Sequence, residues 1–383
     1  MSHVLRLILL VSAVATASAG CSSSSDDGGE AGDGAGDASG GGDDPSDGAD
    51  DAGDGGGDGG GGDGGGGGTD LPPDPLADGP GIVVYWGQNG YGGAHPDDMA
   101  SWEPRLADVC AVPHYDVVVL AFMTSFISAR NGGLPETNFS FHCETPIDAE
   151  RPFLLRCEEI EADIAACHEA GVKVVLSMGG AAGAYGFTSD SEAEAFAETV
   201  WDMFLGGDGE LRPFGAQTLD GVDLDIEGGG PAGYAAFARR MRTIMDGAGG
   251  DWLITAAPQC PFPDAHLGPA PGAALGDAAG AFDYLFVQFY NNFCSGNSGA
   301  PFQDTYAQWS QLTASGGPRI VVGLPATPEA APAGGYVEPA AVADLVDSVR
   351  DDPAFAGLML WDVSFDRQSG APTYGETARA ALD

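Results

Sequence analysis

The run from Asp220 to Glu227 alternates carboxylates with aliphatic residues, in the order Asp-Gly-Val-Asp-Leu-Asp-Ile-Glu. Successive side chains of a β-strand point to opposite faces, so Asp223, Asp225 and Glu227 share one face and the aliphatic residues share the other. Like charge and loss of solvent both raise carboxyl pKa values, so we expect these groups to share at least one proton. A carboxyl with a raised pKa can protonate a leaving-group oxygen near neutral pH. Glu227, the last on the strand, is therefore the predicted general acid of a glycosidase.

Two other interpretations of this run were weighed. Calcium-binding loops alternate acids with glycine and flexible polar residues, whereas Leu224 and Ile226 require a rigid, buried strand. A solvated acidic edge does not fit a strand that is the fourth of eight. The cysteines and histidines form no CxxC or HExxH pattern, so we predict neither a catalytic metal nor a cofactor.

Short runs rich in Val, Ile and Leu recur after Gly81 between segments with helical spacing, which is typical of alternating βα units. The predicted strands cover residues 82–86, 117–122, 172–178, 222–226, 253–256, 285–288, 320–324 and 358–361. The clearest predicted helices cover residues 158–169, 191–204, 232–245, 305–313 and 339–349. Eight strands favour an α/β fold of the (β/α)8 TIM-barrel type over an open doubly wound sheet. The active site of such a barrel lies at the C-terminal ends of its strands.

The acidic run fits the DGxDxDxE signature of glycoside hydrolase family 18, and the chain from Gly81 to about Trp361 resembles the class III, hevamine-type chitinases of plants and fungi. The resemblance extends to further segments along the barrel. They are YWGQNG from Tyr85, LSMGG from Leu176, TAAPQCPFPD from Thr255, VQFYNN from Val287, GLPATPEA from Gly323 and MLW ending at Trp361. The resemblance implies a single catalytic barrel that hydrolyses chitin.

Family 18 is an exception to the two-carboxylate scheme of glycosidases, because the 2-acetamido group of the substrate acts as the nucleophile. The resemblance implies that Glu227 protonates the leaving oxygen and then activates the water that opens an oxazolinium intermediate, with retention of configuration. It also implies that Asp225 orients the acetamide, that Asp223 shares a proton with Asp225, and that Tyr290 holds the acetamide oxygen. The residues expected to line the sugar-binding site are Trp361, as an apolar floor, with Tyr85, Gln88, Gly180 and Gln288.

This mechanism restricts the substrate. A sugar without a 2-acetamido group offers no nucleophile, which excludes cellulose and xylan and favours chitin, chitooligosaccharides or peptidoglycan. For Tyr85 and Trp361 a core role is the alternative, since aromatic residues at strand ends are often buried. The loop between Cys143 and Cys157 is longer than in the plant enzymes, and Gly228 to Pro231 departs from the usual family sequence, so the preferred chain length is not implied.

Seven cysteines are present in the chain. An even number remains when Cys21 is set aside, which in an exported protein predicts disulfides. The resemblance implies the pairs Cys110 with Cys167, Cys143 with Cys157, and Cys260 with Cys294. It also implies non-proline cis peptides at Ala121-Phe122 and Leu360-Trp361.

The first residues carry Arg6, an apolar run and small residues ending at Cys21, which predicts a signal peptide over residues 1–20. We expect Cys21 to be the lipidated residue of a bacterial cell-surface or outer-membrane lipoprotein. Ordinary secretion with a free Cys21 is the alternative, because Ser18 stands where a Leu is usual. Residues 21–79 are nearly all Gly, Asp, Ser and Ala, and are predicted to be a disordered linker rather than a β-roll, since no regularly placed large apolar residue could form a core. The catalytic domain is predicted over residues 80–383.

The formal net charge is -43. Such a charge repels nucleic acid and anionic lipid, so the expected partner is the sugar polymer alone, with membrane contact only through a lipid on Cys21. Nothing in the sequence indicates an oligomer, and we predict a monomer. Two other functions were considered: an endo-β-N-acetylglucosaminidase acting on the chitobiose core of glycans, and a non-catalytic chitin-binding lectin or inhibitor. The hevamine-type segments argue against the first, and the presence of Asp223, Asp225, Glu227 and Tyr290 argues against the second.

Overall fold

The computed structural model describes residues 71–383. The predicted signal peptide, Cys21 and the Gly/Asp-rich segment up to Asp70 lie outside the described residues, so their predictions are not tested. Among residues 71–383, no helix is both long enough and apolar enough to cross a bilayer.

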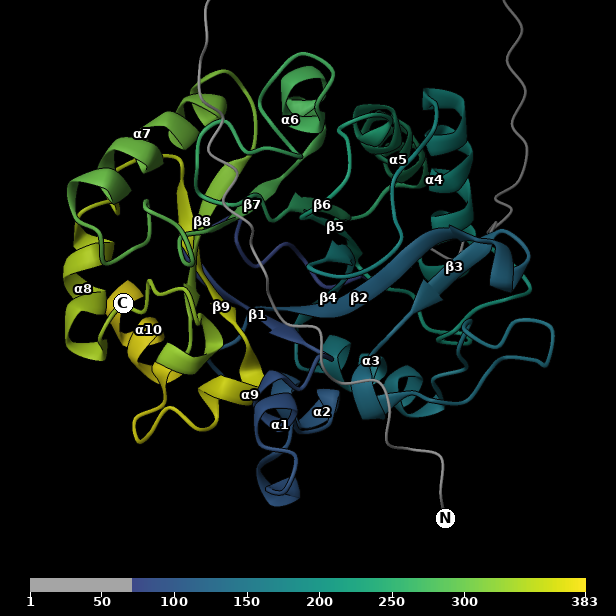
Figure 1. Ribbon diagram of the computed structural model, residues 1–383, viewed down its shortest axis with the longest axis horizontal. Helices are drawn as coiled ribbons and strands as arrows, with labels where there is room; N and C mark the ends of the chain where they lie inside the picture. Colours follow the sequence, from purple (N-terminus) through teal and green to yellow (C-terminus); the bar gives the residue numbers. More distant parts are fainter. Residues whose placement is uncertain (1–70) are drawn as a thin grey trace, which may run out of the picture. The chain divides into compact units, whose positions relative to one another are not determined.

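Eight parallel strands close into a barrel, as predicted (Figure 1). The barrel strands are β1 (Gly81–Trp86), β2 (Val117–Ser128), β4 (Lys173–Gly180), β5 (Gly221–Ile226), β6 (Leu253–Ala256), β7 (Tyr284–Gln288), β8 (Arg319–Pro325) and β9 (Phe355–Trp361). Neighbours in this order are paired, and β1 pairs with both β2 and β9, which closes the sheet. A ninth strand, β3 (Leu134–Thr137), was not predicted. It pairs antiparallel with the end of β2, which runs on to Ser128 instead of ending at Phe122.

The helices lie outside the strands in the order of a (β/α)8 barrel (Figure 1). They are α1 (Gly90–Ala94), α2 (Leu106–Cys110), α3 (Glu158–Glu169), α4 (Asp190–Phe204), α5 (Tyr234–Ala248), α6 (Ala274–Asp277), α7 (Ala300–Ala314), α8 (Pro339–Asp347), α9 (Val363–Asp366) and α10 (Tyr374–Leu382). Single 3-10 turns are η1 (Met99–Ser101), η2 (Ala129–Asn131), η3 (Ser140–His142), η4 (Ala279–Ala281) and η5 (Pro328–Ala330).

The five predicted helices are all present, and their starts depend on local chemistry. Helix α4 begins after Ser189, whose hydroxyl accepts from the backbone N–H of Glu192. Helix α5 begins two residues later than predicted, because Gly233 has a left-handed conformation before it. Helix α7 begins earlier than predicted, with Pro301 in its first turn, where a missing N–H costs nothing.

Two apolar layers hold the barrel together. The outer layer lies between strands and helices and includes Val222, Leu224 and Ile226 of β5. The inner layer fills the barrel and includes Val119 and Phe286. The aliphatic and acidic faces of β5 therefore point as the alternating sequence predicts.

The segment before β1 closes the N-terminal end of the barrel. Leu76 is fully buried in the inner layer. Its backbone oxygen accepts from Arg319 Nη1 at 2.8 Å, and Tyr284 Oη donates to Asp74 at 2.6 Å. Arg319 and Tyr284 begin their strands, so this closure lies at the end opposite the predicted active site.

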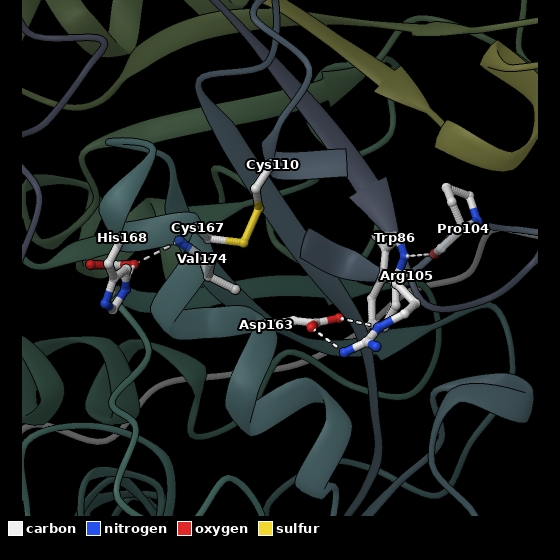
Figure 2. Close-up of a disulfide and its surroundings, with 9 residues drawn as sticks. Trp86, Pro104, Arg105, Cys110, Asp163, Cys167, His168 and Val174 are labelled. Atoms are coloured by element: carbon white, nitrogen blue, oxygen red, sulfur yellow. Dashed lines mark hydrogen bonds and ion pairs between the residues drawn. A yellow bond between two sulfur atoms is a disulfide. The ribbon is translucent and has the colours of Figure 1, made fainter. Parts of the chain in front are cut away.

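The three disulfides have the pairing that the resemblance implies. Cys110–Cys167 joins α2 to α3, close to the ion pair between Arg105 and Asp163 (Figure 2). The other two, Cys143–Cys157 and Cys260–Cys294, tie loops that follow barrel strands.

One of the two expected non-proline cis peptides is wrong by one residue. Ala121-Phe122 is cis as expected, but the second lies at Trp361-Asp362 and not at Leu360-Trp361. Trp361 still pairs with Pro325 in the ladder, and Asp362 then caps α9. Strand β9 itself ends at Trp361, which is the residue where the sequence predicted its end.

Candidate active site

Asp223 lies at the centre of the barrel and is fully buried. The ladder aligns it with Ser177 of β4 and Thr255 of β6. Their hydroxyls donate to its carboxylate at 2.7 and 2.8 Å, and Tyr85 Oη donates at 2.8 Å. Burial raises the pKa of Asp223, and these three hydroxyl donors oppose the rise.

Asp225 lies two residues further toward the C-terminal end of the strand and is 3% exposed. Gln288 Nε2 donates to its Oδ1 at 2.9 Å. Burial, followed by the charges of Glu227 and Asp223, holds the pKa of Asp225 well above its usual range. Glu227 is therefore close enough to Asp225 for the two carboxyl groups to influence each other's protonation.

Glu227 follows the last residue of β5 and is less buried than the two aspartates. Burial raises its pKa first, the charge of Asp264 adds to the rise, and a hydrogen bond with Gln259 opposes it. Its backbone N–H donates to Tyr185 Oη at 3.3 Å. This carboxyl is therefore the outermost of a chain of three that can hold a proton at a pH where an exposed glutamate has lost it.

Two tyrosines, Tyr85 and Tyr290, stand next to these carboxyls, and Trp361 contacts the ring of Tyr85. Tyr290 is 6% exposed, and burial raises its pKa, with further contributions from Asp225 and Glu227. Trp361 is only partly buried, and its ring centroid lies 5.5 Å from that of Tyr85 and 6.1 Å from that of Phe122. Trp361 thus has a supported ring with one part open to solvent.

The other predicted sugar-binding residues lie around this group, but several have side chains that are already engaged. Tyr85 is 2% exposed and bound to Asp223, so it contacts the carboxyls rather than solvent. Gln88 Nε2 donates to the backbone oxygens of Ala121 and Asn138 at 2.7 and 3.0 Å. Gln288 holds Asp225 and also the oxygen of Ala257, at 3.0 Å.

Gly180 ends β4 with a left-handed φ of +88°. A Cβ there would lie 3.0 Å from the ring of Phe122, so a larger residue would displace that ring. Its backbone oxygen accepts from Tyr185 Oη at 2.6 Å. Gly180 thus contacts both Phe122, whose ring lies next to Trp361, and Tyr185, which lies next to Glu227.

The sequence did not single out five residues that contact or charge this group. Ser177 and Thr255 bind Asp223, while Tyr185, Gln259 and Asp264 surround Glu227. Gln259 and Asp264 belong to the TAAPQCPFPD segment, which carried the family resemblance. Thr255 opens the same segment, and Ser177 lies in LSMGG, so the segments that resemble the family carried a signal for four of the five residues, whereas Tyr185 had none.

Within residues 71–383, no three His, Cys, Asp or Glu side chains gather in an arrangement that could hold a metal ion.

Comparison with known proteins gives a consistent match. Residues 81–338 match the family model "Glycosyl hydrolases family 18". The chain is 40% identical over 288 residues to "Chitinase 2" of Rhizopus oligosporus, covering 75% of this chain and 49% of that protein. It is 37% identical over 292 residues to the "Acidic endochitinase" of Cicer arietinum, covering 76% of this chain and 89% of that protein. The chain thus spans about half the length of the fungal relative and most of the plant one.

A solved structure with the same fold has a different description. The xylanase and alpha-amylase inhibitor protein of Scadoxus multiflorus has a TM-score of 0.63 and 32% sequence identity, covering 78% of this chain and 97% of that chain. The fold and much of the sequence are therefore shared by proteins that are described as hydrolases and by a protein described as an inhibitor of hydrolases.

Proposed function

This chain belongs to glycoside hydrolase family 18, and we propose that it is a chitinase that hydrolyses β-1,4-linked N-acetylglucosamine polymers with retention of configuration. The observation that carries the proposal is the row of carboxyls on the inward face of β5, in which three hydroxyls bind Asp223, Gln288 binds Asp225, and burial raises the pKa values of Asp225 and Glu227. The similarity to proteins named chitinase and acidic endochitinase supports the substrate class.

In the first step, Glu227 protonates the oxygen of the scissile bond. Its raised pKa keeps the proton available near neutral pH. The 2-acetamido oxygen of the substrate attacks the anomeric carbon on the opposite side, and the leaving sugar departs with the proton of Glu227. The products of this step are a cyclic oxazolinium ion and an ionised Glu227.

Asp225 orients the acetamide by accepting a hydrogen bond from its N–H. To do so it turns from Glu227 toward the sugar, and the buried Asp223 behind it shares its proton. Tyr290 donates to the acetamide oxygen, and Trp361 forms the floor under the sugar. The burial of these groups supports their roles, because fixed donors stabilise developing charge more strongly when water is excluded.

In the second step, Glu227 accepts a proton from water while the water oxygen bonds to the anomeric carbon. The carbon–oxygen bond of the oxazolinium ion breaks and restores the acetamide. Two displacements at one carbon leave the product in the β configuration. Substrates without a 2-acetamido group do not react.

A non-catalytic binding protein is the second candidate, because the Scadoxus multiflorus structure carries the name of an inhibitor at 32% identity. An endo-β-N-acetylglucosaminidase on glycan chitobiose cores uses the same mechanism and remains a third. The intact set of Asp223, Asp225, Glu227 and Tyr290 favours catalysis over binding alone.

The test is incubation of the purified chain and its Glu227→Gln variant with chitotetraose and chitopentaose, with the anomeric form of the products followed by NMR. β-Anomeric short products from the parent alone support the proposal. If neither protein cleaves and both bind, the chain is a binding protein. Cleavage of a glycoprotein core in preference to chitooligosaccharides identifies the endo-glycosidase.

We also propose that the chain is exported, with residues 1–20 as signal peptide, a linker from residue 21 and a lipid on Cys21. The expected end of the linker at residue 79 is too late, because Leu76 is packed inside the barrel. The three disulfides of the barrel support an oxidising compartment. Mass spectrometry of the mature N-terminus separates lipidation from simple secretion. A single species of monomer mass in light scattering supports the proposed monomer.

A further inference from the structure

A row of four rings, each tilted by 32–44° from the next, runs from the core to the surface next to β1. In order, the rings belong to Trp86, His142, Phe141 and Trp102, with successive centroid distances of 4.2, 4.1 and 5.2 Å. Trp86 is 1% exposed, whereas Phe141 is 40% exposed and Trp102 is partly exposed. The proposed mechanism uses none of these rings.

Hydrogen bonds hold the two inner rings of the row, those of Trp86 and His142. Trp86 Nε1 donates to the backbone oxygen of Pro104 at 2.8 Å (Figure 2). His142 has a side chain only 2% exposed, and its Nε2 lies 3.0 Å from the buried Glu103 carboxyl. The disulfide of Cys143 follows directly after His142. The outer rings therefore rest on a rigid base, and their exposure is not the result of a loose loop.

Glu103 connects this row of rings to Gln88, one of the predicted sugar-binding residues. The carboxylate oxygen that contacts His142 also accepts from the backbone N–H groups of Gly87 and Asn89, at 2.9 and 3.2 Å. Gln88 lies between these two residues and donates to the oxygen of Asn138, three positions before Phe141. The loop after β1 and turn η3 thus meet at Gln88, and the exposed rings lie on the two segments that meet there.

We propose that Phe141 and Trp102 form a sugar-stacking surface that binds the part of a chitin chain extending beyond Gln88, away from the scissile bond. The proposal rests on the proposed chitinase function. Each face of a β-linked pyranose presents C–H groups, which pack against a flat aromatic ring and cover its apolar surface. The polymer is uncharged, which suits a chain whose charge of -43 repels polyanions and anionic lipid.

The inference predicts a loss that depends on substrate length. Phe141→Ala and Trp102→Ala each lower kcat/KM on colloidal chitin about five-fold, and the double variant lowers it more than ten-fold. Activity on chitotriose stays within about two-fold of the parent, because a short substrate occupies only the residues around Trp361. The conservative variants Phe141→Tyr and Trp102→Phe keep a ring and retain most of the polymer activity.

Met99→Ala is the matched control. Met99 lies in the same segment as Trp102 and is 68% exposed, so its removal deletes more exposed apolar surface without deleting a ring. Unchanged polymer activity in this variant supports ring stacking. A loss equal to that of the ring variants indicates general apolar adhesion and overturns the proposal.

Binding is measured separately, by co-sedimentation of the Glu227→Gln chain with insoluble chitin. The double ring variant in that background is expected to bind at least ten-fold more weakly. Unchanged binding, or an equal loss of activity on chitin and chitotriose, overturns the proposed sugar-stacking surface and leaves the proposed function intact.

If the parent cleaves no chitooligosaccharide, the proposed function fails, and the sedimentation result still decides whether the rings bind the polymer. Ring-dependent sedimentation with phosphatidylcholine vesicles instead of chitin would assign the surface to a membrane.

Discussion

Carboxylates at the two ends of this barrel have different neighbours. At the N-terminal end, Asp116, Asp220 and Asp283 each stand directly before a barrel strand. Each accepts from the backbone N–H near the start of the preceding barrel strand, namely Ile82, Val174 and Ile254, at 2.7, 2.6 and 2.7 Å. Each also pairs with a basic side chain, namely Arg379, His168 and Arg242. The same device thus recurs three times around the barrel.

At the C-terminal end the donors are uncharged. Asp223 accepts from hydroxyls and Asp225 accepts from the amide of Gln288. Within residues 71–383, no Lys or Arg forms an ion pair with Asp223, Asp225 or Glu227, and the pKa values of all three are raised by burial. Burial also raises the pKa of Asp283, but there the charge of Arg242 and the backbone N–H of Ile254 oppose the rise. A backbone donor plus a basic partner favours the ionised carboxylate, whereas neutral donors in a buried site favour it less and leave a proton that can move. The difference separates carboxyls that hold the fold from carboxyls that can do chemistry.

The largest expected effect is that of Glu227→Gln, which keeps the size of the side chain and removes the transferable proton. We expect kcat on chitotetraose to fall by roughly a hundred- to ten-thousand-fold, with the unfolding midpoint nearly unchanged. Steady-state kinetics and urea unfolding measure the two effects. A variant that loses stability as much as activity would show that Glu227 belongs with the structural carboxylates.

The matching prediction for the N-terminal end of the barrel concerns the stability of the Asp220→Asn variant. Lys173 has a fully buried side chain whose Nζ lies 3.7 Å from Asp220, and the amide would leave this cation without a counter-charge. We expect a loss of about 3–5 kcal/mol of unfolding free energy, because removing one partner of a buried pair strands the other.

For Asp220→Asn, kcat per folded molecule should stay within about two-fold of the parent at a temperature where the variant is folded. Arg240→Gln is a suitable control, since its ion pair with Glu198 lies on the surface and contributes little. A large fall in kcat with little change in stability would remove the distinction between the two ends.

The sequence predicted the repeating part of the molecule well. The eight barrel strands are apolar runs and the five predicted helices have regular spacing, so local pattern was enough to find them. Helix α10, which is as long as α8, was not among the predicted helices. Strand β3 was missed because Leu134–Thr137 is short and contains Pro135, and only the extended β2 makes it a strand. The second cis peptide was expected one residue too early, although the end of its strand at Trp361 was predicted correctly.

The inward face of β5 also followed from alternation alone. The residues that shift the pKa values of these carboxyls could not be predicted from alternation, because they lie on other strands and loops. Gln259 and Asp264 lie in a loop without periodicity, and Glu103 and His142 are separated by 39 residues. Such contacts depend on the closed barrel, which brings distant loops to one end.

Glu103 provides a further test of the comparison between the two ends of the barrel. It is a buried carboxyl at the C-terminal end, but it accepts from backbone N–H groups, as the aspartates at the N-terminal end do. Burial raises its pKa to about 8 and lowers the pKa of His142 to about 4, so the pair is uncharged between these values. A carboxyl whose folded pKa is raised contributes stability that is complete below about pH 4.5 and is lost as pH rises through 8.

The parent should therefore lose more unfolding free energy between pH 5 and 8 than Glu103→Gln does, by about 2–3 kcal/mol. Urea unfolding across this range measures the difference. Glu192→Gln serves as the control, because that carboxyl is exposed and its pKa is lowered by hydrogen bonds with Thr188. Parallel pH profiles for the parent and Glu103→Gln would contradict the prediction and would mean that folding does not raise the pKa of Glu103.

The smallest expected effect concerns Tyr85→Phe, which removes one of three hydroxyl donors from Asp223 and keeps the ring against Trp361. With one donor fewer, the ionised form of Asp223 is less stabilised and its pKa rises further. One neutral hydrogen bond contributes about 0.5–1.5 kcal/mol, so we expect kcat to fall about two- to ten-fold with KM nearly constant. The pH profile of kcat should also move, because Asp223 and Asp225 titrate together. Tyr284→Phe removes a comparable hydroxyl from Asp74 at the opposite end, where only stability should respond. If Tyr85→Phe raises KM and leaves the pH profile in place, the tyrosine contacts sugar directly and the carboxyls do not depend on it.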